Sequence, residues 1–211
     1  WNPDPEIFSI GGFAIRWYGL LFAAGFLIAY TLISKNLRKA NLTDKNIDLL
    51  LVYIVIGTVV GARLGHTLFY ETEYYLQHPL EIFKPWTGEI GSDNFQFGIR
   101  GLASHGGAVG VLLAILIWAR QKKVPGLWIL DRIGIVTALT GSFIRMGNLM
   151  NSEILGEPAS VSWAFVFERV DQIPRHPAQL YEALSYLLIF AVLYYFFRKR
   201  EARLPNGLLF G

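Results

Sequence analysis

The sequence predicts an all-α polytopic membrane protein of about five transmembrane helices, with its N-terminus outside. Of its 211 residues, 53% are hydrophobic and only 17% are charged, which is far from the composition of an average soluble domain. Several windows approach the ~20 apolar residues that span a bilayer. Lys and Arg residues also gather in alternate loops. We expect one transmembrane helical domain over residues 1–211, with outward loops that can hold a small hairpin.

The predicted spans lie at 17–34, 49–70, 105–119, 127–144 and 179–197. The first and last are nearly unbroken apolar runs, whereas Gly, Arg, His or Asp residues interrupt the others. After the last span, the basic cluster RKREAR precedes LPNGLLFG, in which Pro and Gly stand before a new apolar run. We therefore expect a further span to start near 205–211, and the chain to be a truncated one.

The loops divide into two sets by charge. Segments 35–48, 120–126 and 198–203 hold 4, 3 and 4 Lys or Arg residues, so these short loops should face the cytoplasm. The N-terminal stretch and the two loops before the third and fifth spans hold 6 Lys or Arg residues and 11 of the 16 acidic residues. They should face outward, and the two sets alternate along the spans without conflict.

Composition also excludes several functions. The net charge of +3 does not favour nucleic acid binding, because most basic residues are expected beside anionic lipid head groups and no basic stripe carries stacking aromatics. The absence of cysteine excludes disulfides, thiolate catalysis by the chain and cysteine metal sites. The sequence contains no HExxH, GxSxG, GxxxxGK[ST] or dinucleotide-binding glycine motif. We expect neither a metal nor a cofactor.

The second predicted span combines small and charged residues. Gly57, Gly61 and Gly65 recur every four residues, which clears one helix face for a close neighbour. Arg63 and His66 lie in the same segment. An arginine at the centre of a span costs about 2.5–3.5 kcal/mol on insertion scales, so such residues usually face the bundle interior and mark a functional path. The alternative is an interfacial arginine that pairs with a carboxylate or reaches the lipid head groups.

The third span begins with SHGG, which places His105 at its outward end. A lone histidine at an interface is commonly a hydrogen-bonded structural residue, although histidine is also the side chain that most readily acts as a base near neutral pH. The fourth span is expected to run from inside to outside and to end near Arg145. Both side chains should then lie at the same outward level, which favours a functional role for His105.

In the stretch IRMGNLMNSEILGEP, polar residues follow directly on the apolar run of the fourth span. If the fourth helix continues into it, Arg145, Asn148 and Ser152 lie within about 60° of one another. Arginine offers a planar fork of donors that matches phosphate, and asparagine amides bind hydroxyl or phosphate oxygens. Glu153 is placed to orient the arginine, and Gly156 permits a break or a close ligand approach. A polar helix terminus that meets water is the alternative interpretation.

Two further elements lie at outward helix ends. RHPAQLYE stands at the start of the fifth span, where Gln179 and Glu182 should share a helix face. Tyr18 lies at the outward end of the first span, where an aromatic residue of the membrane interface is the simpler interpretation. Taken together, the residues offer a base, phosphate-binding cations and amide donors without a nucleophile. Such a set suits a reaction in which the nucleophile arrives on a substrate.

Five sequence elements together resemble the bacterial prolipoprotein diacylglyceryl transferases: FSIGGFAIRWYGL, GARLGHTLFYE, SHGG, RMGNLMNSE and RHPAQLYE. They occur in the family's order over nearly the whole chain, and RMGNLMNSE is highly specific. The resemblance implies an enzyme of the bacterial inner membrane that moves diacylglyceryl from phosphatidylglycerol to the lipobox cysteine thiol of a preprolipoprotein, releasing glycerol phosphate. Its partners would be these substrates and membrane lipid, and its active site would face the periplasmic or outer leaflet.

The resemblance implies catalytic roles for His105 and Arg145. The thiol of a free cysteine has a pKa near ~8.5 and is mostly protonated at neutral pH, so His105 is the expected base. Arg145 is expected to stabilise the charge that grows on the departing phosphate. The resemblance also implies substrate-binding roles for a second set of residues, and we add Arg63 because it lies within a predicted span. The full set is Tyr18, Arg63, Asn148, Asn151, Glu153 and Gly156.

Two departures from the family stand out. The stretch TGEIGSDNFQFGIRGLA before SHGG is longer than the family's compact segment, which implies a different outward loop. The family also continues beyond GLLFG with further helices, one of which carries an arginine of the catalytic site. If the molecule ends at Gly211, we expect little or no activity.

A lipid or anion transporter, or a non-catalytic receptor for phospholipid head groups, is the alternative function. Arg63 and Arg145 would then line a path. Transporters commonly show repeated halves and broken helices near the membrane midplane. No repeat is visible here, and the polar residues gather at outward helix ends, which favours an enzyme that works at one leaflet.

Overall fold

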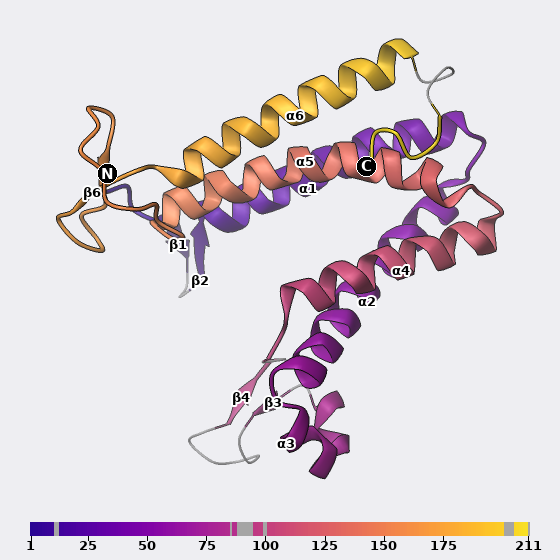
Figure 1. Cartoon of the computed structure of the whole chain (residues 1–211), viewed down its shortest axis with the longest axis horizontal. Coiled ribbons are helices and arrows are strands. Elements are labelled where there is room, and N and C mark those ends of the chain that lie inside the picture. Colours follow the sequence, from indigo (N-terminus) through magenta and orange to yellow (C-terminus); the bar gives the residue numbers. More distant parts are fainter. Residues whose placement is uncertain (11–12, 85, 88–94, 99–100, 201–204, 211) are drawn as a thin grey trace. The chain divides into compact units, whose positions relative to one another are not determined.

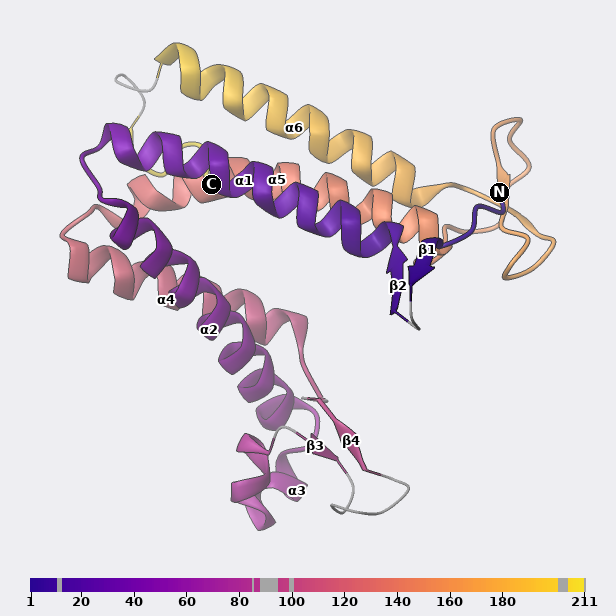
Figure 2. The same cartoon turned by 180° about the vertical axis from the view of Figure 1, so that it is seen from behind.

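The computed structural model describes residues 1–10, 13–84, 86–87, 95–98, 101–200 and 205–210, and it is mainly helical (Figures 1 and 2). Its long helices are α1 (Trp17–Lys39), α2 (Asp44–Phe69), α4 (Ser104–Lys122), α5 (Gly126–Asn151) and α6 (Ala178–Arg200).

Four of these helices, α1, α2, α5 and α6, are long and apolar enough to cross a membrane. The prediction of a polytopic all-α membrane protein is therefore confirmed in its fold class. The fifth helix, α4, has 19 residues, begins with Ser104 and His105 and ends near Arg120 and Lys122. Each predicted span overlaps one helix, and most of these helices are longer than predicted because they continue into the polar residues at their ends.

The described chain forms two compact units, each of which is considered by itself. The first contains Trp1–Asn41 and Leu130–Gly211, and the second contains Leu42–Ile129. Most of α5 belongs to the first unit, whereas α2 and α4 belong to the second. The single domain expected over residues 1–211 stays a prediction.

In the first unit, α5 packs against both α1 and α6. The backbone of α1 approaches α5 at Gly25, where an added Cβ would lie 2.8 Å from Phe143 Cβ. On the other side, the Ser142 hydroxyl donates a 2.8 Å hydrogen bond to the carbonyl oxygen of Ala183 in α6. The three helices lie side by side in both views (Figures 1 and 2). Their contacts bury apolar residues such as Leu149, which is 2% exposed.

Two small hairpins stand at one end of this unit. The strands β1 (Glu6–Ile10) and β2 (Phe13–Arg16) pair antiparallel, as do β5 (Phe165–Val166) and β6 (Pro174–Arg175). The second pair confirms the hairpin predicted for an outward loop. The first was not predicted, although a Gly-Gly dipeptide between two apolar runs is a recognised hairpin signal.

Trp1 joins the N-terminus to the loop that contains β5. Its amino group donates a 2.7 Å hydrogen bond to the Val166 carbonyl, and its indole Nε1 donates one of 2.9 Å to the Leu149 carbonyl. The indole also stacks on Phe165 with 5.3 Å between ring centroids. The N-terminal segment is thus held against the end of α5.

In the second unit, α2 and α4 pack backbone to backbone. An added Cβ at Gly57 would lie 2.6 Å from the Gly110 carbonyl oxygen, and one at Gly65 would lie 2.7 Å from Gly106 Cα. Gly61 is equally close to the same two glycines of α4. This confirms the close approach predicted from the four-residue spacing.

Beyond α2 the chain forms short elements: α3 (Thr72–Gln77), the 3₁₀ helix η1 (Pro79–Phe83), and the antiparallel pair β3 (Trp86–Thr87) and β4 (Gln96–Phe97).

The last described residues, 205–210, return to α5 in the first unit. The Asp131 carboxylate, on a side chain that is almost fully buried, accepts hydrogen bonds from the backbone N–H groups of Gly207 (2.7 Å), Leu209 (2.9 Å) and Phe210 (2.9 Å). Neighbouring backbone N–H groups that converge on one carboxylate are typical of a helix N-terminus.

Candidate functional site

The site in the first unit is built on the end of α5. The helix stops at Asn151, and the next residues turn sharply, with φ of 55° at both Ser152 and Ile154. Left-handed backbone is uncommon for residues other than glycine and costs roughly 1–3 kcal/mol at each position. The predicted helical row is therefore wrong at Ser152. Arg145 and Asn148 remain on α5, but Ser152 lies beyond its end, where its hydroxyl accepts a 3.0 Å hydrogen bond from Arg169.

Glu153 is the centre of the polar contacts after this turn. Its carboxylate accepts hydrogen bonds from the side-chain amides of Asn148 (3.3 Å) and Asn151 (3.1 Å). Its backbone carbonyl accepts a 2.5 Å hydrogen bond from Nε2 of Gln179 in α6. The structure thus brings together three of the predicted site residues with one that sequence reasoning had placed only on a helix face.

Arg145 has a different partner from the one expected. Its Nε lies 2.6 Å from Oε2 of Glu182 in α6, in an ion pair whose side chains are half-buried. The expectation that Glu153 orients Arg145 is wrong, because the chain turns after Asn151 and directs the Glu153 carboxylate to the two asparagines. Glu182 contacts the Nε edge of the guanidinium, and the opposite edge, with its two Nη groups, can still bind a phosphate bidentately.

Two glycines allow neighbours to approach the site. An added Cβ at Gly147 would lie 2.8 Å from the ring of Tyr18, so the Tyr18 ring packs directly on α5 between Arg145 and Asn148 in sequence. Gly156 lies against the carbonyl of His176, just before α6 begins. A side chain at either position would collide with these neighbours, so the two glycines allow Tyr18 to lie against the end of α5 and Gly156 to lie against the start of α6.

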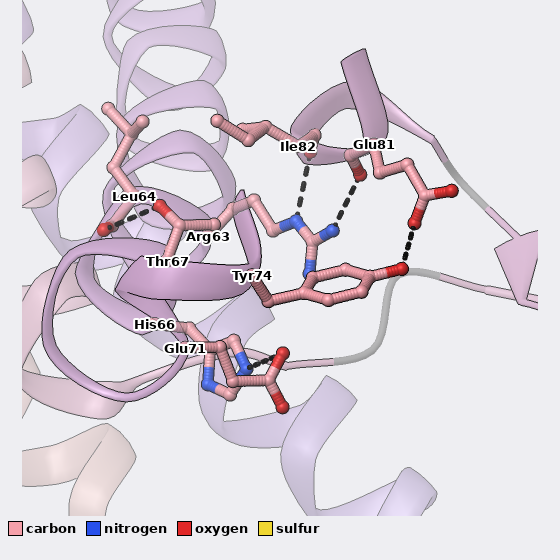
Figure 3. Close-up of polar contacts among 8 residues, drawn as sticks. All are labelled: Arg63, Leu64, His66, Thr67, Glu71, Tyr74, Glu81 and Ile82. Atoms are coloured by element: carbon pink, nitrogen blue, oxygen red, sulfur yellow. Dashed lines mark hydrogen bonds and ion pairs between the residues drawn. The ribbon is translucent and has the colours of Figure 1, made fainter. Parts of the chain in front are cut away.

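Arg63 belongs to the second unit, where its side chain binds the backbone of η1 in the loop that follows α2 (Figure 3). Its Nε donates to the Ile82 carbonyl at 2.9 Å, and its Nη2 donates to the Glu81 carbonyl at 2.8 Å. Its guanidinium carbon lies 4.9 Å from the centroid of the Tyr75 ring. These contacts fix η1 against α2. The substrate-binding role of Arg63 stays a prediction.

Arg63 lines a cavity of about 1080 Å³. On its wall, the Tyr74 hydroxyl donates a 2.7 Å hydrogen bond to Glu81, which lowers the pKa of the Glu81 carboxyl and raises the pKa of Tyr74 (Figure 3). His66 Nε2 lies 3.5 Å from a Glu71 carboxylate oxygen. Neutral and charged groups of both signs line this cavity, so it shows no preference for one ligand charge.

His105 lies in the first turn of α4, also in the second unit, and its side chain is exposed. Its ring stands 5.6 Å from that of Phe69 and 5.8 Å from that of Tyr70. It forms one end of an apolar groove of about 760 Å³ along α2 and α4. His105 and Arg145 belong to different units, so each is described only with its own neighbours. Among the described residues, no group of three or more His, Asp or Glu side chains could hold a metal ion.

The comparisons with known proteins agree on one family. The model of the family described as prolipoprotein diacylglyceryl transferase matches residues 5–211. The chain is 52% identical over 212 residues to the phosphatidylglycerol–prolipoprotein diacylglyceryl transferase of Tolumonas auensis, covering 100% of this chain and 77% of that protein. It is 44% identical over 211 residues to the enzyme of the same name from Bacteroides fragilis, covering 100% of the chain and 76% of that protein. A third relative of that name, from Chloroherpeton thalassium, is 46% identical over 212 residues, with 100% and 75% covered.

Proposed function

Because the chain belongs to the prolipoprotein diacylglyceryl transferase family, we propose that it transfers the diacylglyceryl group of phosphatidylglycerol to a prolipoprotein. The match of the family's model to residues 5–211 is the observation that supports this function. The four apolar helices support a multi-pass membrane protein, and the relatives carry the names of bacterial enzymes. We place the protein in the bacterial inner membrane, with its site at the periplasmic or outer leaflet.

The acceptor in this proposal is the thiol of the lipobox cysteine. A sulfur–carbon bond forms at the glyceryl carbon that carries the phosphate, and the carbon–oxygen bond to that phosphate breaks. The bonding electrons leave with glycerol phosphate, and the thiol proton passes to a base. Because the chain has no cysteine of its own, the only thiol in the reaction is the one that the substrate brings.

Arg145 is the residue that we assign to the phosphate. Its Nε lies against Glu182. Its two Nη groups are spaced so that they can each donate to one oxygen of a phosphate. A cation at that place favours the transition state, in which negative charge grows on the departing phosphate. Tyr18 and Gly156, which border the same end of α5, are assigned to the lipid's binding surface.

The base assigned to the thiol proton is His105. General-base assistance is typically worth about 10²–10⁴ in rate, and an imidazole suits this work near neutral pH. Its exposed position at the start of α4 leaves the ring accessible to a substrate. This assignment stays a prediction, as does a role for Arg63 in binding the substrate.

The test is the mass of a lipobox peptide after incubation with the purified protein and phosphatidylglycerol in mixed micelles. We expect the mass to rise by one diacylglyceryl group. Arg145→Ala should reduce the rate by about 10²–10³, as removal of one transition-state donor does in other enzymes. His105→Ala should reduce it by about 10²–10⁴.

Two matched variants serve as controls. Arg16→Ala removes an exposed arginine that pairs with Glu6 at 3.0 Å, and His78→Ala removes an exposed histidine that stacks on Tyr74. Both should leave the rate within about threefold, since surface contacts of this kind contribute little. An unchanged peptide mass with the unsubstituted protein, produced with the helices that its family carries beyond Gly211, would contradict the proposed function.

A further inference from the structure

The hydrogen bonds around Glu153 fix the orientation of three side-chain amides. A carboxylate and a backbone carbonyl can only accept, so Asn148, Asn151 and Gln179 must each direct an NH₂ group toward Glu153. The carbonyl oxygen of each amide therefore points away from Glu153. A single acidic residue thus sets the direction of three acceptor atoms.

These three carbonyl oxygens are buried without a hydrogen-bond partner. Within the part of the chain that the structure describes, Oδ1 of Asn148, Oδ1 of Asn151 and Oε1 of Gln179 accept no hydrogen bond. Asn148 is 5% exposed and Gln179 is 1% exposed, so bulk water does not replace the missing donors. Burying an acceptor without a donor is unfavourable, and such groups in native proteins call for an explanation. A ligand that supplies donors would explain all three.

We propose that Gln179 is a head-group-binding residue, and that its Oε1 acts with Oδ1 of Asn148 and Oδ1 of Asn151 to accept hydrogen bonds from the hydroxyl groups of the lipid's glycerol head group. This inference rests on the proposed function. It assigns the recognition of the head group to a set of acceptors, whereas the earlier assignment of Asn148 and Asn151 concerned their amide donors.

The chemistry divides the recognition of the lipid between two kinds of residue. Arg145 offers donors, which suit phosphate, but phosphate is common to every glycerophospholipid. Carbonyl oxygens repel phosphate oxygens and require a donor, which the hydroxyls of a glycerol head group supply. A site built to bind a hydroxyl discriminates strongly against an analogue that lacks it, because its buried polar groups are then left unpaired.

Gln179 also has a positioning role, because its Nε2 holds the Glu153 carbonyl and so ties the turn after α5 to α6. A substitution would disturb both roles. Loss of positioning should slow the reaction with every lipid donor, whereas loss of the acceptor should slow it only with donors that carry hydroxyls. The ratio of kcat/KM for a lipid with head-group hydroxyls to kcat/KM for a lipid without them therefore separates the two roles.

The experiment measures kcat/KM for phosphatidylglycerol and for phosphatidylpropanol, which has the same phosphate and a head group of the same length without hydroxyls. We expect the unsubstituted protein to prefer phosphatidylglycerol by about tenfold or more. Gln179→Met, which has a similar shape but no carbonyl, should lower that preference by about tenfold. Should this variant fail to fold, Gln179→Asn replaces it, because it shortens the side chain and withdraws the oxygen while keeping an amide.

The matched control is Ser142→Ala. Ser142 is also buried between α5 and α6, where its hydroxyl bonds to the Ala183 carbonyl, but it has no contact with Glu153 among the described residues. Its loss should affect both lipids equally and leave their ratio unchanged. Equal loss of both rates in Gln179→Met, or no preference in the unsubstituted protein, would overturn the inference. No turnover of either lipid by the unsubstituted protein would instead refute the proposed function.

Discussion

Arg145 owes its orientation to a residue in another helix. Glu182 lies 37 residues further along the chain and contacts Nε of Arg145 at 2.6 Å. Such a contact restricts the guanidinium plane, because Nε–H points in one fixed direction relative to the two Nη groups. The two side chains are half-buried, so water screens the attraction between their opposite charges less than it would at an exposed surface. Glu182 is therefore a positioning residue for the proposed phosphate contact.

Substitution Glu182→Ala should lower kcat by about ten- to a hundredfold, because misplacing a binding group by about 1 Å can cost 10² in rate. Glu182→Gln keeps the shape of the side chain and an oxygen beside Nε, and it should retain most of the activity that Glu182→Ala loses. The measurement is kcat and KM in the lipobox peptide assay. Glu6→Ala, which breaks the exposed pair with Arg16, is the control. Equal losses in the alanine and glutamine variants would argue against positioning through this contact.

Sequence reasoning found some residues of the site and missed the contacts of others. Arg145 and Asn148 were identified because an arginine and an amide one helical turn apart are unusual at the end of a span. The placement of Gln179 and Glu182 on one helix face was correct, but nothing in the spacing indicates which residue they meet. The break at Ser152 was missed because left-handed backbone usually signals itself by glycine, and here serine and isoleucine adopt it.

At the level of elements, the α2–α4 pair depends on the absence of side chains where the backbones meet. Gly110→Ala should destabilise the protein by about 1–3 kcal/mol, the usual cost of overpacking, because its Cβ would collide with the backbone of Gly57 and Gly61. Thermal unfolding in detergent, followed by circular dichroism, measures the change. Gly19→Ala is the matched control, because an added Cβ there has no neighbour within 4 Å. That control should be neutral or slightly stabilising, and equal melting temperatures for the two variants would refute the packing argument.

The loop after α5 should weaken in acid. Arg175 donates a 2.7 Å hydrogen bond to Asp171, which holds the pKa of that carboxyl below its usual value of 3.8. A carboxyl with a lowered pKa in the folded state contributes stability that is complete above the usual pKa and is lost as the pH falls through the lowered one. Because Arg175 also contacts the Gly156 carbonyl at 3.4 Å, this loss loosens the segment beside the site.

We therefore expect the amide hydrogens of β5 and β6 to exchange faster below about pH 4 than exchange chemistry alone predicts. Hydrogen exchange with mass spectrometry between pH 3 and 6 measures this, with conditions matched for intrinsic rate. Asp171→Asn should remove the pH dependence and leave the loop equally protected throughout. A steep acid response in Asp171→Asn would assign the effect to another group.

The helices were predictable because a long run of apolar residues is a strong signal for a membrane-spanning helix. Their bounds were not predictable, because each helix continues into the polar residues that flank the apolar run. The β5–β6 pair is only two residues per strand, and the sequence predicted no more than a small hairpin in an outward loop, without its residues. The β1–β2 hairpin escaped prediction, since its residues were assigned to an outward segment before a span. Short strands near a membrane boundary carry too few residues to stand out from the surrounding aromatics.

For the whole molecule, the distribution of Lys and Arg predicts a topology with the N-terminus outside. The absence of native cysteine allows a direct test with single introduced cysteines. We expect Ser160→Cys to react with a membrane-impermeant maleimide in intact spheroplasts, and Ala40→Cys to react only after the membrane is opened. Both positions are exposed, so a difference in labelling reports the side of the membrane. The opposite pattern would invert the proposed placement of the site.

The carboxylate of Asp131 has a consequence for the order of events during synthesis. Its hydrogen-bond donors begin 76 residues later, at Gly207, so they do not yet exist when α5 leaves the ribosome. At about 5–20 residues per second, roughly 4–15 s pass before they are made. During that interval the carboxylate must remain hydrated or in contact with the insertion machinery, since an unpaired charge is costly in lipid. The final seating of α5 therefore waits for a segment that is translated after it.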